Sequence, residues 1–311
     1  MSEPLVPEVA SALYANAAVS HCRLFYMNEA QQPQVERLQA LVTQHQLSLS
    51  LVTELVTVKL NQKNREQLCV ESTQPILLLD DKNKLSWLSN GLSVTPEWDK
   101  LQRRVVSAGR KTELLLQAAK TTADSQVIDA TAGFGHDSLI LASTGAQVTM
   151  LEQQPIMALL LLAEQHRMSA QPNWQKLMAR LQIINTDALS YFDNHYLADF
   201  QGNLAMTKAV DVVYLDPMFP NDSYQDSKTG KGAKVGKLMQ ALHHLASPPT
   251  AAQELQLLQS AQAVVSAIDT HKQQGRVIVK RPKDAPLFAQ QVPDESWHNE
   301  AVRFDGYFLS V

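Results

Sequence analysis

The segment YLDPMFPND, residues 214–222, places an acidic side chain, two prolines and an aromatic ring directly after a strand-like stretch. An amino group on a planar ring is a poor nucleophile, because its nitrogen lone pair is delocalised into the ring. Asp216 and the carbonyl of Pro217 can accept the hydrogens of such an amine while Phe219 stacks on the ring. Pro217 and Pro220 fix backbone dihedral angles and hold this arrangement. The segment therefore predicts a site that acts on a planar amine, with Asp216, Pro217 and Phe219 as catalytic residues.

Such a site needs correct positioning and a few aimed acceptors rather than a strong base, since the ammonium formed by alkylation loses its proton easily. Met218 is expected to line the pocket without taking part in the chemistry. The structural alternative is a simple turn that ends the strand and buries Phe219.

Three further acidic residues follow strand-like segments. Asp129 precedes the glycines of DATAGFGHDS, Glu152 ends the next segment, and Asp187 lies in NTDAL after a third. In an open α/β sheet, ligands bind outside the carboxyl ends of the strands, so these side chains are expected at the same edge as the amine site. Gly133 and Gly135 let the backbone turn tightly and approach a ligand.

The ligand expected at this edge contains an adenosine. Glu152 can accept hydrogen bonds from both ribose hydroxyls, and Asp187 can bind the adenine amine, although an Asp in this position also caps helices. Ser138 stands where a dinucleotide-binding loop has its third glycine, and Asp129 and Asp137 crowd the place of a pyrophosphate. A ligand without phosphates fits better. S-adenosylmethionine is such a ligand, and its sulfonium and amino group are cations that acidic residues attract.

The elements that must position these residues form two expected units. Residues 1–95 read as a small α/β unit whose role the sequence leaves open, with strands predicted at 22–27, 55–60 and 75–80 and a helix at 33–46. Over 96–311, strands alternate with helices, which indicates an α/β fold with a mostly parallel sheet covered on both faces. Its strands are predicted at 126–130, 147–152, 181–185, 210–216 and 276–281, followed by an antiparallel pair from WHNEAVRF and GYFLSV that makes seven.

Composition narrows the class of protein. Hydrophobic residues make up 45% and charged residues 19% of the 311, which is ordinary for a globular protein. A formal net charge of −4 argues against bulk attraction to nucleic acid and still permits a local basic patch.

The chain begins without a secretory signal pattern, and its longest apolar run, 156–163, is too short to cross a bilayer, so a cytoplasmic protein without membrane contact is expected. The two cysteines have no metal-binding spacing, and no metal is expected.

The segments VIDATAGFGHDS, MLEQQP, VVYLDPMFP and VKRP, in this order and spacing, resemble the ribosomal RNA small-subunit methyltransferase J family over about residues 100–311. The resemblance implies a Rossmann-like, seven-stranded class I methyltransferase domain with S-adenosylmethionine as cofactor. It also implies that the chain methylates the exocyclic N2 of one specific guanine in 16S rRNA, with the free rRNA or the small ribosomal subunit as partner.

The same resemblance implies that residues 108–113 form the far wall of the cofactor pocket, with Arg110 and Glu113 as contacts. His136 stands where the family has an arginine, and Ser107 and Ala108 stand where it has more glycines. The full set of expected cofactor-binding residues is Asp129, Ala130, Gly133, Gly135, His136, Asp137, Glu152, Gln153, Asp187, Asp216 and Arg110.

A guanine amine inside a helix is inaccessible, so the target must be unpaired or flipped out. Phosphate contacts would stabilise that state. The expected RNA-contacting residues, besides Phe219, are Lys228, Lys231, Lys234, Lys237, Lys280 and Arg281, with Arg103, Arg104 and Lys283 as further candidates. The alternatives are a solvated flexible loop for the four spaced lysines and a strand end that merely reaches solvent for Lys280.

Three other functions are compatible with the same residues. An amino-methyltransferase that acts on another RNA, on DNA or on a protein amide would use the same Asp-Pro-x-aromatic chemistry. A nicotinamide-dependent oxidoreductase would account for Gly133, Gly135 and Glu152 and leave DPMFP unused. A non-catalytic RNA-binding module could retain the methyltransferase fold, because fold alone does not fix function.

Overall fold

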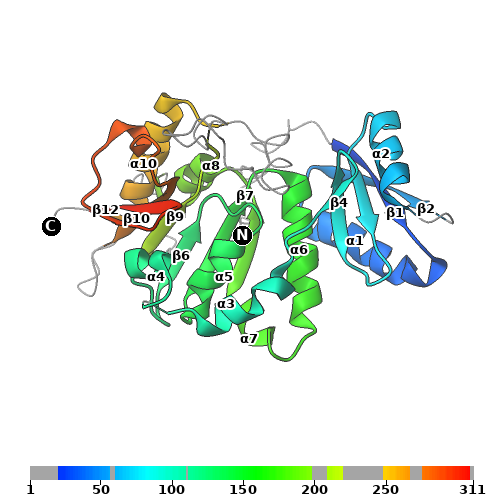
Figure 1. The fold of residues 1–311 in the computed structure, drawn as a ribbon, viewed down its shortest axis with the longest axis horizontal. Helices are drawn as coiled ribbons and strands as arrows, with labels where there is room; N and C mark the ends of the chain where they lie inside the picture. Colours follow the sequence, from blue (N-terminus) through cyan, green and yellow to red (C-terminus); the bar gives the residue numbers. More distant parts are fainter. Residues whose placement is uncertain are drawn as a thin grey trace, which may run out of the picture.

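The structure is a computed structural model that describes residues 20–56, 60–109, 111–197, 209–219, 248–266 and 275–308. Within these residues the chain forms a five-stranded sheet of order β2-β1-β3-β4-β5 and a seven-stranded sheet of order β11-β12-β10-β9-β6-β7-β8. Helix α6 (Pro155–Ser169) stands between the two sheets (Figure 1).

The five-stranded sheet is mixed. Strand β1 lies between β2 and β3 and pairs in parallel with both, and β3, β4 and β5 continue as antiparallel neighbours. The elements of this unit are β1 (Ser20–Tyr26), α1 (Gln32–Gln44), β2 (Leu49–Leu55), α2 (Gln62–Glu71), β3 (Ile76–Leu79), β4 (Leu85–Ser89) and β5 (Leu92–Val94).

Three of the four elements predicted for this unit are confirmed, whereas of the strand predicted at 55–60 only Leu55 lies in a strand among the described residues. The strand lies at Leu49–Leu55, where Leu49 pairs with Ser20 of β1. Both segments are rich in Leu, Val and Thr, so composition does not decide between them. Thr57 to Lys59 lie outside the described residues. The hairpin of β4 and β5 was not predicted.

The seven-stranded sheet confirms the expected Rossmann-like α/β fold. Five of its strands fall within two residues of the predicted bounds. The strands are β6 (Gln126–Asp129), β7 (Gln147–Glu152), β8 (Leu181–Asn185), β9 (Val212–Leu215), β10 (Arg276–Pro282), β11 (Glu295–His298) and β12 (Val302–Phe308).

The antiparallel pair predicted at the end of the chain is present, but the turn between its strands lies within WHNEAVRF rather than between WHNEAVRF and GYFLSV. WHNEAVRF does not form one strand, because Asn299 accepts hydrogen bonds from the backbone N–H groups of Ala301 and Val302 and turns the chain there. β12 therefore runs through Phe304 to Phe308 and inserts between β10 and β11.

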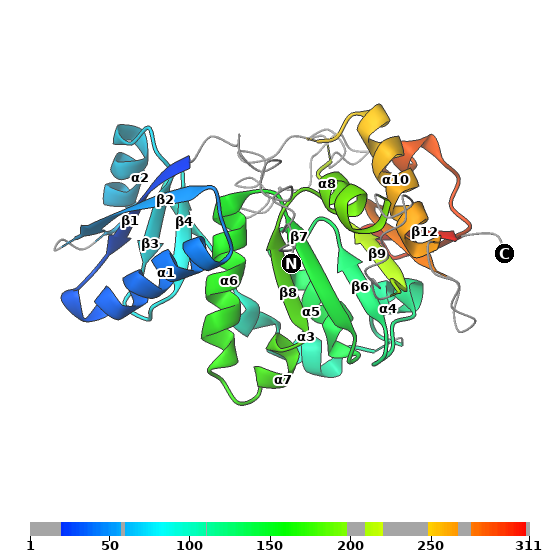
Figure 2. The same cartoon turned by 180° about the vertical axis from the view of Figure 1, so that it is seen from behind.

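Alternate residues of the seven-stranded sheet enter two different cores. Val127, Val148 and Val212 belong to one core, and their neighbours Ile128 and Val213 belong to the other. The first face packs against the layer of α3 (Gln102–Ser107), α4 (Leu114–Ala119), α5 (His136–Ser143) and α7 (Gln175–Met178). The second face is covered by α8 (Ala188–Phe192) and α10 (Ala251–Ser266) (Figure 2).

The first core also runs through the five-stranded sheet. It joins Leu24, Leu77 and Trp87 of that sheet to Trp98 and to Leu159 on α6. Helix α6 contacts α1 and β4 on one side and β7 and β8 on the other. A helix in this position needs an apolar surface around most of its circumference, and every residue from 156 to 162 is buried. The boundary near residue 95 stays a prediction.

Candidate active site

The glycine loop, defined here as residues 130–135, connects the end of β6 to the start of α5. Gly133 and Gly135 have φ values of +52° and +71°, which a residue with a Cβ rarely adopts. The tight turn expected at both glycines is confirmed. The N–H of Gly133 donates a hydrogen bond of 3.0 Å to Oε2 of Glu152, so the loop lies against the end of β7.

Two carboxyl groups behind this loop titrate near neutrality. Burial raises the pKa of Glu152 to about 7, although hydrogen bonds from the backbone of Gln154 and Gly133 partly oppose the shift. Burial likewise raises the pKa of Asp129 to about 7, against hydrogen bonds from the Ser138 hydroxyl and the Thr131 N–H. Each group is accordingly divided between its charged and neutral forms at physiological pH.

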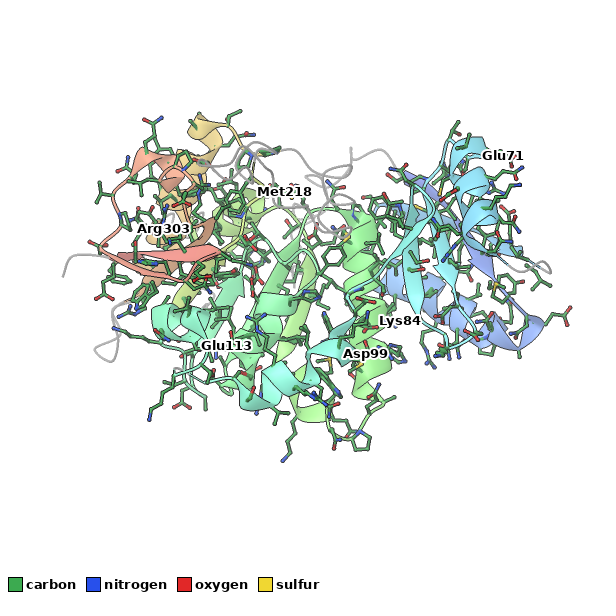
Figure 3. All side chains as sticks on the ribbon, in the orientation of Figure 1. Glu71, Lys84, Asp99, Glu113, Met218 and Arg303 are labelled. Atoms are coloured by element: carbon green, nitrogen blue, oxygen red, sulfur yellow. The ribbon has the colours of Figure 1, made fainter. Side chains whose placement is uncertain are left out.

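A pocket of about 400 Å³ opens at the carboxyl ends of the strands. It collects lining residues from four strand ends and from α10. The predicted residues among them are Ala130, Gly133, Glu152, Gln153, Asp187, Asp216 and Pro217, and Met218 lines the pocket as expected. Figure 3 labels Met218 at this end of the sheet. Asp187 also caps α8, since its Oδ1 accepts a hydrogen bond of 2.9 Å from the N–H of Ser190.

Beside the pocket, Lys280 joins two carboxylates. Its Nζ lies 2.7 Å from Oδ2 of Asp137 and 2.8 Å from Oδ2 of Asp216. The hydroxyl of Tyr214 donates a second hydrogen bond of 2.7 Å to Asp137. The backbone N–H of Asp216 donates to Oγ1 of Thr131 at 2.6 Å and holds the Asp-Pro segment against the glycine loop.

The two carboxylates of this cluster differ electrostatically. Burial opposes ionisation of Asp137, but the charge of Lys280 and the hydrogen bonds from Lys280 and Tyr214 outweigh it and lower the pKa of Asp137. Burial raises the pKa of Asp216, and Lys280 only partly offsets burial and the nearby Asp137 charge. The Lys280 ammonium is therefore shared by the carboxylates of Asp137 and Asp216. When both are ionised, this cluster of three residues has a net negative charge, which attracts a cation.

Two basic residues that were predicted to contact RNA make contacts within the protein. Arg281 is 5% exposed, donates to Glu254 and to the carbonyl of Pro286, and its guanidinium lies 4.7 Å from the ring centre of Phe219. Arg281 is thus held by contacts within the protein, and its predicted contact with RNA stays a prediction. The ammonium of Lys280 binds Asp137 and Asp216, so this side chain does not merely reach solvent, and its predicted contact with RNA stays a prediction.

The remaining predicted residues either do not line the pocket or lie outside the residues that the structure describes. Phe219 is 5% exposed, as in the buried-turn alternative, so its stacking role stays a prediction. The ring of His136 faces the carbonyl of Pro96 at 2.6 Å, and Glu113 pairs with Arg104. Arg110, Pro220, Lys228, Lys231, Lys234 and Lys237 lie outside the described residues.

Sequence reasoning missed Tyr214 and the pairing of Lys280 with Asp216. Val279 pairs with Leu215, so Lys280 and Asp216 each follow a paired residue and lie side by side. Tyr214 lies two residues before Asp216 and shares its face of the strand. Strand periodicity could have suggested Tyr214, whereas the register that brings Lys280 to Asp216 required the structure.

Neither a membrane span nor a metal cluster is found in the part of the chain that the structure describes. No described helix is long and apolar enough to cross a bilayer. Among the same residues, no group of three or more His, Cys, Asp or Glu side chains is arranged to hold a metal ion.

Comparisons with known proteins show the family to which this chain belongs. A family model described as SAM-dependent methyltransferase, where SAM is S-adenosylmethionine, matches residues 51–309. Ribosomal RNA small subunit methyltransferase J of Psychrobacter cryohalolentis is 74% identical over 290 residues, covering 93% of this chain and 96% of that protein. The protein of the same name from Acinetobacter baylyi is 38% identical and covers 71% of this chain and 77% of its own length.

A solved structure shows the same fold over nearly the whole chain. The SAM-dependent methyltransferase from Neisseria gonorrhoeae superposes with a TM-score of 0.61 at 25% identity and covers 92% of this chain and 95% of that one. By its sequence and its fold, this chain belongs to the ribosomal RNA small subunit methyltransferase J family of S-adenosylmethionine-dependent methyltransferases.

Proposed function

We propose that this chain transfers the methyl group of S-adenosylmethionine to the exocyclic N2 of one guanine in 16S rRNA, either free or in the small ribosomal subunit. One observation carries the proposal. Asp216 and Pro217, which suit a planar amine, line the same pocket as Glu152 and Asp187, which suit an adenosine. The names of the relatives, which refer to ribosomal RNA of the small subunit, support the choice of substrate.

The donor set of the pocket fits the cofactor. Each oxygen of Glu152 accepts one backbone hydrogen bond, from Gly133 or Gln154, and keeps a lone pair for a ribose hydroxyl. Asp187 keeps one carboxylate oxygen beyond its helix cap for the adenine amine. The excess negative charge around Asp216 and Asp137 suits the sulfonium.

The reaction then needs few groups. S-adenosylmethionine supplies an electrophilic methyl group. Lys280 fixes Oδ2 of Asp216, and among the described hydrogen bonds Oδ1 has no partner, so it can accept a hydrogen of the guanine amine together with the Pro217 carbonyl. As the amine nitrogen bonds to the methyl carbon, the carbon–sulfur bond breaks, S-adenosylhomocysteine leaves, and the surplus proton passes to Asp216 or water. Positioning supplies most of the acceleration.

The test is methylation of small ribosomal subunits that lack the modification. Purified protein, labelled S-adenosylmethionine and such subunits, or free 16S rRNA, are incubated, and the labelled nucleoside is identified by digestion and mass spectrometry. We expect N2-methylguanosine at a single site. Tight binding of S-adenosylhomocysteine without incorporation into either RNA would keep the cofactor site and overturn the substrate.

A further inference from the structure

Trp98 holds the glycine loop from outside the pocket lining. Its indole Nε1 donates a hydrogen bond of 2.7 Å to the carbonyl of Phe134, and the side chain is completely buried. At the pocket, the N–H of Gly133 is bonded to Glu152. The loop is therefore fixed between a carboxylate that faces the cofactor site and a tryptophan that belongs to the core.

Packing brings the indole against the backbone of the loop. A Cβ on Gly135 would lie 2.9 Å from Cζ2 of Trp98 and 2.6 Å from Cε of Met150, so only glycine fits there. A second hydrogen bond joins the same two segments, because Nε2 of His136 lies 2.6 Å from the carbonyl of Pro96. The loop and the segment around Trp98 thus form one packed unit.

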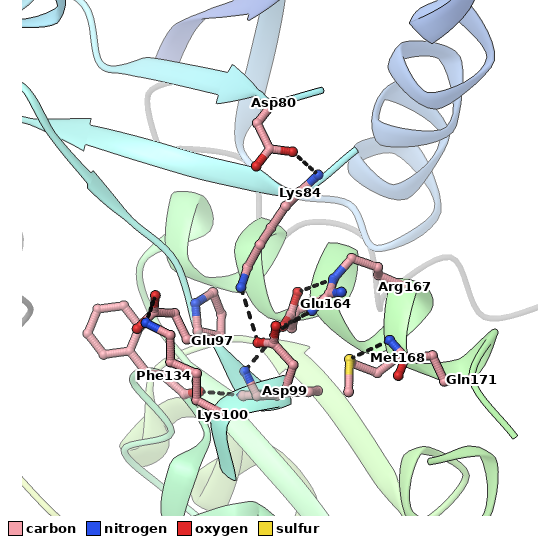
Figure 4. Close-up of polar contacts among 12 residues, drawn as sticks. Asp80, Lys84, Glu97, Asp99, Lys100, Phe134, Glu164, Arg167, Met168 and Gln171 are labelled. Atoms are coloured by element: carbon pink, nitrogen blue, oxygen red, sulfur yellow. Dashed lines mark hydrogen bonds and ion pairs between the residues drawn. The ribbon is translucent and has the colours of Figure 1, made fainter. Parts of the chain in front are cut away.

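The five-stranded sheet sets the position of Trp98. Its last strand, β5, ends at Val94, and Glu97, with φ of +53°, turns the chain into the short 3-10 helix Trp98–Leu101. Asp99 in this helix accepts a hydrogen bond of 3.2 Å from Nζ of Lys84, which lies in the turn before β4 (Figure 4).

A chain of ion pairs completes the connection to α6. The backbone N–H of Trp98 donates to Oε1 of Glu164 at 3.2 Å, and Arg167 binds both oxygens of Glu164 at 2.7 and 2.8 Å. Arg167 also lies 3.7 Å from Asp99. Glu164 is only 3% exposed, and these partners satisfy both of its carboxylate oxygens. Lys84, Asp99, Arg167 and Glu164 therefore link the five-stranded sheet to the backbone of Trp98.

We propose that Trp98 is a positioning residue for cofactor binding, and that the five-stranded sheet increases the affinity for S-adenosylmethionine by holding Trp98 against the glycine loop. A loop fixed in its binding conformation loses less conformational entropy when the ligand binds. The inference rests on the proposed placement of the cofactor beside Glu152. It gives the N-terminal sheet a role that needs no contact between that sheet and RNA.

The first test is Trp98→Phe, which removes the indole N–H and keeps a buried aromatic ring. Calorimetry should show about fivefold weaker binding of S-adenosylhomocysteine, the effect of leaving one buried carbonyl without its donor. Methyl transfer at saturating S-adenosylmethionine should stay within about twofold of wild type, because Trp98 touches no reacting atom. Amide hydrogen exchange in the peptide that contains Phe134 should become faster.

The matched control is Trp87→Phe. Trp87 is buried in the same core, and among the described contacts its side chain makes no hydrogen bond. Its replacement should leave the affinity and the loop exchange unchanged. A folded Trp98→Phe protein with wild-type affinity and wild-type loop exchange would overturn the inference. Wild-type protein that binds S-adenosylhomocysteine but methylates no RNA would remove the proposed substrate and leave this inference standing.

A second variant tests whether the five-stranded sheet increases cofactor affinity, and it keeps the inference testable if Trp98→Phe does not fold. Lys84→Glu places a negative charge beside Asp99 and should weaken S-adenosylhomocysteine binding about threefold at low salt, with a smaller effect at high salt. Lys82→Glu makes the same change of charge in the same turn, at a side chain without a described ion pair. Equal affinities of the two variants at low salt would contradict a role for the sheet.

Discussion

The two sheets use the polar side chains at their strand ends in different ways. In the five-stranded sheet, Asp80 follows β3 and accepts hydrogen bonds from the N–H groups of Lys82 and Lys84, so it closes its own turn. Arg23 on β1 pairs with Glu54 on β2 at 2.7 Å. These groups find their partners within the sheet and leave little hydrogen-bonding capacity for a ligand.

At the carboxyl end of the seven-stranded sheet, the polar groups are only partly satisfied. Glu152 and Asp216 line a pocket, each is fixed by one or two donors, and each keeps free lone pairs. Both sheets thus carry carboxylates close to strand ends. What distinguishes the candidate site is the unused hydrogen-bonding capacity of its carboxylates and the pocket into which it faces.

The largest effect that would test this contrast is expected from Asp216→Ala. Loss of one aimed acceptor should lower the single-turnover rate of methyl transfer by about 100-fold or more, while S-adenosylhomocysteine affinity stays close to that of wild type. Rapid-quench measurements with labelled cofactor and saturating RNA give the rate. A variant that transfers methyl groups at the wild-type rate would remove Asp216 from the chemistry.

Lys280→Met tests whether the cluster beside the pocket depends on its single cation. Two carboxylates would lose their partner, so the free energy of unfolding should fall by about 2 kcal/mol at pH 8, less than for a fully buried pair. At pH 5 the loss should be smaller, because the carboxyl groups can take up protons instead. Urea unfolding at both pH values measures this. Lys283→Met, at a lysine without a described ion pair, is the control, and equal losses in the two variants would contradict the assignment.

The raised pKa of Glu152 predicts that cofactor affinity depends on pH. With a pKa of about 7 in the free protein, Glu152 is mainly neutral at pH 6 and mainly charged at pH 8. Ribose hydroxyls donate to the charged form, so S-adenosylhomocysteine should bind about tenfold more weakly at pH 6 than at pH 8. Calorimetry at the two pH values tests this, and Glu152→Gln should abolish the difference. Persistence of the full difference in that variant would assign it to another group.

The smallest effect is expected from Arg23→Met in the five-stranded sheet. Arg23 keeps the pKa of Glu54 below its usual value, so the pair stabilises the fold at neutral pH and loses this contribution as pH falls through that lowered pKa. Both side chains are about one-third exposed, which limits the loss of stability to less than about 1 kcal/mol. Cofactor affinity should not change. If Arg23→Met weakened S-adenosylhomocysteine binding more than Lys84→Glu does, the polar groups of the five-stranded sheet would also contribute to ligand binding, and the contrast between the two sheets would be wrong.

Sequence reasoning predicted five strands of the seven-stranded sheet and the carboxylates at their ends, because both depend on local patterns. The strands β7 and β8 have the bounds expected from their apolar runs, and the glycines of the loop have the φ values that their residue type suggested. Local patterns did not predict contacts between segments that lie far apart in the sequence. Lys280 meets Asp216 across 64 positions, and Trp98 meets Phe134 across 36.

The different surroundings of Lys280 and Arg281, which were both predicted to contact RNA, have the same origin. Neighbouring residues of a strand point to opposite faces, so one of the two must turn toward Asp216 and the other away. The pairing of β10 with β9 decides which, and it sends Lys280 to the carboxylates and Arg281 to Phe219. The sequence offers two basic residues and no means of choosing between them.

Helix α6 has a consequence for how the molecule unfolds. It contributes buried side chains to contacts with both sheets, and neither sheet can separate from it without exposing a large apolar surface to water. The two sheets should therefore unfold in one cooperative transition, whose calorimetric enthalpy includes the unfolding of both sheets. A fragment that lacks the first sheet should then show no cooperative melting transition, because α6 would expose the apolar side chains that contact α1 and β4.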